Sequence, residues 1–424
     1  MRIQVALDNW GLIGGSERYA GEIVRALAAR EHRIELLCGA TAEPAMELPA
    51  GVALRIEPAY SDGAASARAL EQMTQRSRAH NADVLLVLSC FQGRTFEALL
   101  ELTPPVPIVR FVQDHSPFCP SLNKIEADGE NCQRPLGVAC LERYFIGSGC
   151  SCFHQSGRAR PWIEGIGEFK KKLLEFDSLR RASALLVASA YMQRELVQAG
   201  ESRDRIAVIP YFTGSNSAAI ARAQLSSATR EFLSTNDAPL IFTPARLALP
   251  DKGIDVLLAA LAQTAAPWRA VIAGDGPARV WLEARCKAEG LADRVHFAGW
   301  QSAGQIETLY ARAQVVAFPS TWKEPFGLVG IEAMAHGKPV VAFDVGGVSE
   351  WLEHDRTGLC VPRGDVAAFA AALSRLCGDS ALAARLGQAG HQRAEAEFRA
   401  NLHVSRIEAQ LEIAAGVSAT AFAH

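Results

Sequence analysis

The chain has 424 residues, enough for two or three domains, and its 49% hydrophobic and 21% charged residues are an ordinary globular composition. A formal net charge of −3 gives no drive towards nucleic acid, and the absence of any run of about eighteen apolar residues argues against a spanning helix. The N-terminus, MRIQVALDNW, lacks the apolar core and cleavage site of a signal peptide, so we expect a cytoplasmic protein.

Strand-like runs alternate with amphipathic segments along the first half of the chain. Residues 2–8 (RIQVALD) are typical of a strand, 15–30 of a helix and 33–39 of a strand, a βαβ unit that implies a parallel sheet. The strand-like runs are mostly apolar, as expected for strands with both faces covered by helices. Further runs of the same kind occupy 82–89, 107–114, 184–189 and 205–210.

A second series of strands begins after a stretch rich in Ser, Ala, Thr and Asn at 213–238, which we interpret as a linker. The pattern predicts an α/β protein of two doubly wound, Rossmann-like domains, at 1–212 and 239–396. Ligands of such sheets bind outside the carboxyl ends of the strands, here in a cleft between the domains. The strands of the second series are predicted at 240–245, 269–274, 294–299, 314–319 and 339–344.

Two features of the first half can carry chemistry. Gly14 and Gly15 follow the first strand, where their bare backbone can approach an anion at a helix start, although a plain tight turn explains them equally well. The stretch is neither G-x-G-x-x-G nor a P-loop, which disfavours NAD and ATP. His115 follows the strand at 107–114 and can bind a sugar hydroxyl or move a proton, but a histidine satisfied by nearby backbone is the simpler interpretation.

Two cations follow the first strand of the second series. Arg246 and Lys252 bracket a loop that opens an amphipathic helix. A guanidinium fork and an ammonium beside a helix N-terminus would suit a diphosphate. The alternative is a pair of solvated surface cations.

Two carboxylates stand eight residues apart, Glu324 in the loop TWKEPFG and Glu332 in the helix-like LVGIEAMAHG. That spacing is not the offset of a facing pair on one helix. The start of this helix offers backbone N–H groups to an anion. Those groups belong to Phe326, Gly327, Leu328 and Val329.

These residues carry a resemblance to a known family. EPFGLVGIEAMAHGKPVVAFDVGGVSEWL resembles the E-x7-E region of the retaining glycosyltransferases of family four, the glycosyl transferases group 1 set with the GT-B fold. ARLALPDKGIDVLLAAL is similar to the family's R-L-x4-K-G loop, VIAGDGPARVWLE to its G-x-G-P turn, and GGSER to its glycine-rich loop. VHFAGW and FPSTWKEPFG follow in the family's order. The resemblance covers nearly all of the second domain and the first more loosely.

The resemblance implies a retaining, metal-independent transfer of a sugar from a nucleotide diphosphate donor to a saccharide or lipid-linked acceptor, in bacterial polysaccharide or envelope glycan synthesis. No cofactor is implied. Residues 397–424 would form a helix that crosses back to the first domain. In the family's scheme Arg246, Lys252 and the N–H groups of 326–329 would hold the diphosphate, Glu332 the ribose and Glu324 the transferred sugar, with Gly14 and Gly15 near the phosphates and His115 facing the sugar.

Other interpretations of the same cleft stay open. A nucleotide-sugar epimerase shares the fold, and so would a catalytically silent subunit that only binds a sugar nucleotide. A phosphorylase would need a pyridoxal lysine, for which no segment gives a suitable context. Intact Glu324, Arg246 and Lys252 favour an active transferase.

Two further segments suggest additional properties. A cysteine-rich insertion at about 116–155 lacks the paired C-x2-C spacing of a zinc site, so free thiols or a redox pair are favoured over zinc held with His154. Residues 167–181 (GEFKKKLLEFDSLRR) are basic and apolar, which fits peripheral contact with the inner membrane or, as we favour, a core-packed helix with a solvated basic face. The cysteines are Cys119, Cys132, Cys140, Cys150 and Cys152.

Overall fold

The structure is a computed structural model whose contacts divide into two units, Met1–Tyr211 with Ala400–His424, and Phe212–Arg399. We refer to them as unit 1 and unit 2. The residues that the structure describes are 1–11, 15–43, 46–79, 81–90, 92–102, 105–119, 124, 126, 132–134, 136–137, 140, 162–213 and 223–417.

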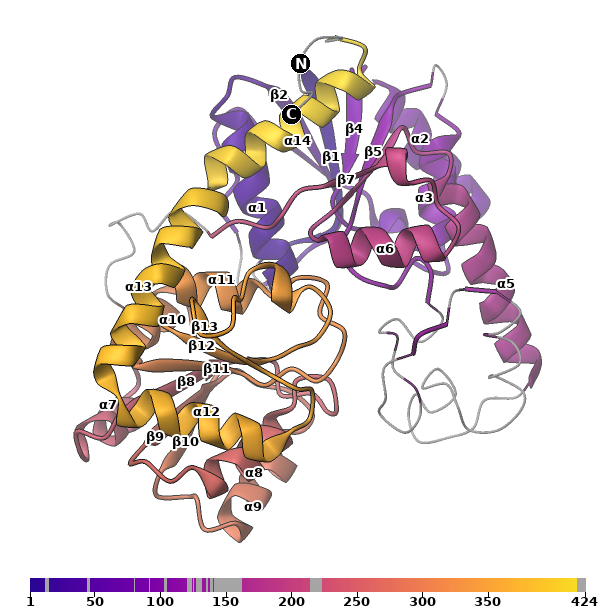
Figure 1. The fold of residues 1–424 in the computed structure, drawn as a ribbon. Coiled ribbons are helices and arrows are strands. Elements are labelled where there is room, and N and C mark those ends of the chain that lie inside the picture. Colours follow the sequence, from indigo (N-terminus) through magenta and orange to yellow (C-terminus); the bar gives the residue numbers. More distant parts are fainter. Residues whose placement is uncertain are drawn as a thin grey trace. The chain divides into compact units, whose positions relative to one another are not determined.

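Unit 1 is built on a seven-stranded sheet in the order β3-β2-β1-β4-β5-β6-β7, in which all neighbouring strands run parallel (Figure 1). In the register of the central strands, Val5 of β1 lies opposite Leu36 of β2 on one side and Leu86 of β4 on the other. All three side chains are buried, as sequence periodicity predicts for a covered parallel sheet. The strands are β1 (Arg2–Trp10), β2 (Arg33–Thr41), β3 (Ala53–Ile56), β4 (Val84–Val87), β5 (Ile108–Val112), β6 (Ala184–Val187) and β7 (Ile206–Val208).

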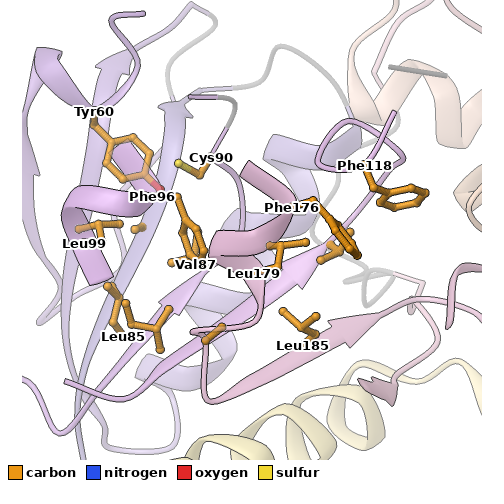
Figure 2. Packing of buried hydrophobic residues seen from close by; sticks show 14 of the residues in the cluster. Tyr60, Leu85, Val87, Cys90, Phe96, Leu99, Phe118, Phe176, Leu179 and Leu185 are labelled. Carbon is orange, nitrogen blue, oxygen red and sulfur yellow. The ribbon is translucent and has the colours of Figure 1, made fainter. Parts of the chain in front are cut away.

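Helices cover both faces of this sheet. On one face, Phe96 and Leu99 of α3 and Phe176 of α5 pack against Leu85 and Val87 of β4 in the core of unit 1 (Figure 2). On the other face α14 packs against α1 and reaches β4 and β5. The helices of unit 1 are α1 (Gly15–Ala28), α2 (Ala67–Ala79), α3 (Gly93–Leu100), α5 (Trp162–Leu179), α6 (Ala190–Gln198) and α14 (Ala400–Ala414), with short 3₁₀ turns η1 (Pro58–Tyr60) and η4 (Arg203–Arg205).

His403 of α14 is buried in an aromatic cluster on this second face. Its Nδ1 donates to the carbonyl of Pro210 over 2.6 Å, and its Nε2 lies 2.7 Å from the hydroxyl of Tyr19. The rings of Phe111 and Tyr211 stack beside it with centroids 5.6 Å apart. Burial, partly offset by the hydrogen bond to Pro210, lowers the pKa of His403 from 6.5 to about 4.

This histidine makes stability depend on pH. Between pH 6.5 and about pH 4 the unfolded chain protonates His403 while the folded protein does not, so the free energy of unfolding should fall by about 3 kcal/mol over that window. Above pH 6.5 and below pH 4 this residue adds no slope. The free energy of unfolding, measured by urea denaturation at each pH in this range, should depend less on pH in His403→Gln than in the wild type. The exposed control His354→Gln should follow the wild type. Equal slopes in all three proteins would contradict the assignment.

Unit 2 is built on a six-stranded parallel sheet in the order β10-β9-β8-β11-β12-β13. Helices α8 and α12 pack together on one side of the sheet, and α11 with α13 on the other (Figure 1). The strands are β8 (Leu240–Pro244), β9 (Arg269–Ala273), β10 (Val295–Gly299), β11 (Val315–Phe318), β12 (Val340–Phe343) and β13 (Gly358–Val361). The helices are α7 (Ser227–Ser234), α8 (Ile254–Gln263), α9 (Arg279–Ala288), α10 (Ala303–Arg312), α11 (Leu328–Ala335), α12 (Val366–Gly378) and α13 (Ser380–Glu397), with the 3₁₀ turn η5 (Val348–Glu350).

The predicted fold class is confirmed: both halves are α/β units with doubly wound parallel sheets. Every strand-like run predicted from the sequence overlaps a strand. The interpretation of 213–238 as a linker is wrong for part of that stretch, because Ser226 caps α7 by accepting from the Thr229 N–H. The hydroxyl of Thr229 then lies 2.9 Å from His296 Nε2 of β10, which ties α7 to unit 2.

Across the described ranges, no single helix combines the length and apolarity needed to cross a bilayer, and only the bent pair α12 and α13, at 102°, passes on length and composition.

Candidate functional site

The site in unit 2 lies where the strands end, because parallel strands bring their carboxyl ends to one edge of the sheet. Gly253, at φ 59°, begins α8, and a Cβ built on it would lie 2.0 Å from the carbonyl oxygen of Pro319. A Cβ built on Gly346, at φ 58°, would lie 2.2 Å from the Glu324 carbonyl oxygen, and the Gly347 N–H donates to that carbonyl over 2.8 Å. At these two glycines the loops after β8, β11 and β12 are in direct backbone contact.

Lys252 and Glu324, predicted from separate motifs, form one ion pair at this edge. Lys252 Nζ lies 2.7 Å from Glu324 Oε1, with side-chain exposures of 24% and 8%. The same carboxylate oxygen accepts from the hydroxyl of Ser320 over 2.6 Å. The ammonium also lies 5.1 Å from the ring centre of Trp322. Glu324 is thus a buried carboxylate held from two sides, while Lys252 is partly open to solvent.

Arg246 lies on the same loop as Lys252 but is exposed. Within the described part of the chain its guanidinium has no hydrogen bond or ion pair. An exposed guanidinium with its donors unused is suited to an anionic ligand, and it equally fits the alternative of a solvated surface cation.

The start of α11 combines a buried anchor with exposed polarity. Phe326 is 1% exposed, and its carbonyl accepts from the indole N–H of Trp351 over 2.7 Å, so its side chain belongs to the core. Gly327 follows at φ 112° as the N-cap, and Leu328 and Val329 open the helix. The first N–H groups of a helix have no acceptor within the helix, and those of α11 directly follow the loop that holds Glu324.

Gly330 is where α11 meets Trp351. A Cβ on Gly330 would lie 2.0 Å from Trp351 Cη2, a distance that no packing tolerates. We expect Gly330→Ala to lower the free energy of unfolding of unit 2 by about 1–3 kcal/mol through overpacking, measured by urea denaturation. The matched control is Gly378→Ala, whose Cβ would meet nothing closer than Ala266 at 3.8 Å. If Gly330→Ala unfolds at the same urea concentration as the wild type, the prediction is wrong, and Trp351 can move aside without loss of stability.

Glu332 is half-buried on α11 and has an aromatic partner that sequence reasoning missed. The hydroxyl of Tyr310, from α10, donates to Glu332 Oε2 over 3.2 Å. The Tyr310 ring stacks on His336 with centroids 4.7 Å apart. Burial lowers the pKa of His336, but its hydrogen bonds to Glu307 and to the Glu332 carbonyl outweigh this and raise it. No motif marks Tyr310, because a single tyrosine in an amphipathic helix is an ordinary core residue.

The candidate residues of unit 1 lie at the carboxyl edge of its own sheet. Gly15 is the first residue of α1 and is exposed, whereas Gly14 lies outside the described residues. His115 is 0% exposed, its Nε2 lies 2.8 Å from the hydroxyl of Tyr191, and its ring meets Phe118 edge-on. His115 is therefore a buried histidine whose Nε2 partner is a side-chain hydroxyl and not the backbone, and its contact with a sugar stays a prediction.

A hollow of about 70 Å³ opens next to His115, at the carboxyl ends of β4 and β5. Arg110 lines it, is 3% exposed, donates to the Cys90 carbonyl over 3.2 Å and lies over the ring of Phe96 at 4.3 Å. Asp114 lines the same hollow. Acceptors and donors side by side are suited to hydroxyl-rich ligands. Its remaining lining includes Ser16, Ser89, Cys90, Gln113 and Ser116.

The zinc hypothesis falls largely on residues that the structure does not describe. Cys119 is buried, and Cys132 and Cys140 are partly buried. Cys150 and Cys152 lie outside the described residues. Among the residues that are described, no group of three or more His, Cys, Asp or Glu side chains is arranged to hold a metal ion.

Comparison with known proteins decides the family. Residues 227–393 match the family described as "Glycosyl transferases group 1", and residues 14–211 match the "Glycosyl transferase 4-like domain". Together the two matches extend over most of both units. The chain belongs to the group 1 glycosyltransferases.

Relatives and solved structures agree with this membership. An alpha-D-kanosaminyltransferase of Streptomyces kanamyceticus is 33% identical over 226 residues, which are 51% of this chain and 57% of the relative. A glycogen synthase of Mycobacterium tuberculosis is 30% identical over 253 residues, again 57% of its length. The chain thus spans little more than half of these curated relatives.

The GT-B fold expected from the sequence is confirmed by structural similarity. A sucrose-phosphate synthase from Thermosynechococcus elongatus has a TM-score of 0.72 at 22% identity, covering 98% of this chain and 100% of that one. Anabaena HepE in complex with UDP-glucose has a TM-score of 0.70 at 20% identity, covering 97% and 100%. This group 1 glycosyltransferase therefore has the two-unit fold of both proteins.

Proposed function

We propose that this group 1 glycosyltransferase moves a sugar from a nucleotide diphosphate donor to a saccharide or lipid-linked acceptor, with retention of configuration and without a metal. The observation that carries the proposal is the meeting of Lys252, Arg246, the buried Glu324 and the start of α11 at one sheet edge. A diphosphate needs cations and N–H groups, and a transferred sugar needs a fixed carboxylate next to them. HepE, which shares the fold, is bound to UDP-glucose in its structure.

In this proposal the donor diphosphate lies against Arg246, Lys252 and the N–H groups of Gly327 to Val329. These groups stabilise the negative charge that develops on the leaving phosphate oxygens, the task a metal ion performs in other enzymes. Glu324 contacts the sugar near its reacting carbon. Glu332, with Tyr310 fixing its carboxylate, binds the ribose hydroxyls, so Glu332→Ala weakens donor binding.

The acceptor side is assigned to unit 1. His115 faces the transferred sugar, and the hollow lined by Arg110 and Asp114 offers hydrogen bonds to a hydroxyl-rich acceptor. Helix α5 supports contact with an anionic membrane, the surface on which lipid-linked acceptors reside: its exposed face carries Lys170 and Arg180 together with Leu173 at 41% and Leu174 at 53% exposure. An enzyme with such an acceptor would act in bacterial polysaccharide or envelope glycan synthesis.

A thermal-shift screen of UDP, GDP and their sugars tests the donor class, and nucleoside diphosphate release with candidate acceptors tests transfer. Stabilisation by one diphosphate series, acceptor-dependent release that survives EDTA, and a product whose anomeric configuration by NMR is the same as the donor's are the expected results. Donor binding without release for any acceptor would favour a silent subunit. Interconversion of sugar nucleotides without an acceptor would favour an epimerase. Plasma mass spectrometry of the same protein reports on zinc.

A further inference from the structure

A buried chain of polar groups runs from His115 into the cysteine-rich insertion. His115 Nε2 lies 2.8 Å from the Tyr191 hydroxyl. Tyr191 also hydrogen-bonds Glu195, one helical turn further along α6. Lys124 Nζ then lies 3.0 Å from Glu195 Oε2. Each of these four side chains is at most 7% exposed, so water does not compete with the contacts.

The direction of each hydrogen bond follows from the protons available. An ammonium has only donors, and a buried carboxylate paired with it stays ionised and only accepts. Tyr191 must therefore give its single hydroxyl proton to Glu195, since burial and then the Glu195 carboxylate raise its pKa far above the ordinary value of 10.0. Its oxygen is left as an acceptor towards His115.

We propose that Tyr191, Glu195 and Lys124 act as positioning residues that hold His115 as the tautomer protonated on Nε2. Nδ1 is then the nitrogen with the lone pair, and it accepts whatever donor it meets. If His115 faces the transferred sugar, as the proposed function states, it does so as an acceptor for a sugar hydroxyl and not as a donor.

The insertion supplies the terminal charge of this chain. Lys124 takes the unusual φ of 55°, and its Nζ also donates to the Arg134 carbonyl over 2.6 Å. The Lys124 carbonyl in turn accepts from the Cys132 N–H over 2.7 Å. A lysine so held by the insertion, and buried against Glu195, makes the state of His115 depend on the insertion that follows it in the sequence.

The test is a substitution that keeps the shape of these side chains but reverses the direction of the hydrogen bonds between them. In Glu195→Gln, Lys124 has only donors and takes the amide oxygen, so the amide N–H donates to the Tyr191 oxygen. Tyr191 must then donate to His115 Nε2, which moves the imidazole proton to Nδ1. Long-range ¹⁵N–¹H NMR of ring-labelled histidine at alkaline pH, where imidazole is neutral, distinguishes the two tautomers. The His115 signals are those that vanish in His115→Gln.

We expect the Nε2–H pattern in the wild type and the Nδ1–H pattern in Glu195→Gln. The matched control is Tyr60→Phe, which removes another buried hydroxyl of unit 1, bonded to the Ser89 carbonyl over 2.7 Å, and should leave the His115 signals unchanged. An Nδ1–H wild type, or a Glu195→Gln spectrum that matches the wild type, overturns the proposal. The measurement needs no substrate, so a failure of sugar transfer would refute the proposed function without touching this result.

Discussion

Glu324→Gln is expected to lower the kcat of sugar transfer by about a hundredfold or more, the scale on which a single preorganised electrostatic contact to a transition state acts. The carboxylate accepts from Ser320 and Lys252 and is 8% exposed on its side chain, so its charge is little screened by water. A neutral amide of the same shape keeps the packing but removes the charge that the proposed function puts beside the reacting carbon. Stopped assays of nucleoside diphosphate release, at saturating donor and acceptor, measure the loss.

The same substitution makes a second, opposite prediction for binding. Lys252 no longer pairs with Glu324, so its ammonium is entirely available to the diphosphate, and donor affinity should stay constant or rise. Glu289→Gln at the C-cap of α9 is the matched control, because it also loses a carboxylate charge that pairs with an arginine in unit 2. A variant of Glu324 that binds donor far more weakly yet turns over normally would reverse the assigned role.

Arg246→Ala is expected to raise the dissociation constant for the donor about tenfold to a hundredfold, since hydrogen bonds to charged groups contribute about 1.5–3 kcal/mol. The guanidinium is exposed, so its removal should leave the unfolding midpoint unchanged. Isothermal titration with the nucleotide diphosphate measures the affinity, and repeating it at higher salt should shrink the difference between variant and wild type.

Arg230→Ala is the control for that effect. Arg230 is also exposed and belongs to the same unit, but it lies on α7, which packs on β10 at the far end of the sheet order from β12 and β13. It removes the same charge from the same unit. If both variants lose equal affinity, the effect is general attraction by positive charge, and Arg246 has no specific place at the diphosphate.

Much of the fold could be predicted because most strands are buried on both faces and therefore largely apolar. The exceptions have a physical cause. β3 (ALRI) is an edge strand with largely exposed side chains, and β13 (GLCV) is an edge strand of the other sheet that begins with a glycine, so neither has a distinctive pattern. Helix α7 inside 213–238 is short, and the polar composition of this stretch is typical of a linker, so the pattern does not indicate a helix. Its one local signal is Ser226, an ordinary N-cap.

The candidate site divides in the same way. Motif spacing placed Arg246, Lys252, Glu324 and Glu332 after strands of one sheet, and topology explains why they share an edge. Spacing does not show which side chains touch, so the pairing of Lys252 with Glu324 and the bond from Tyr310 to Glu332 emerged only in three dimensions. The burial of His115 was likewise out of reach, because it depends on Tyr191 and Phe118 closing over the ring.

The backbone contacts at Gly253 and Gly346 also limit how this site can diversify. Where one loop lies against the main chain of another with no room for a methyl group, the three loops form a single rigid scaffold, and lengthening any of them would displace the other two. New donor preferences are accessible through the side chains that project from that scaffold, one substitution at a time. The glycines therefore fix the backbone of the site, while the exposed side chains of its loops remain free to change.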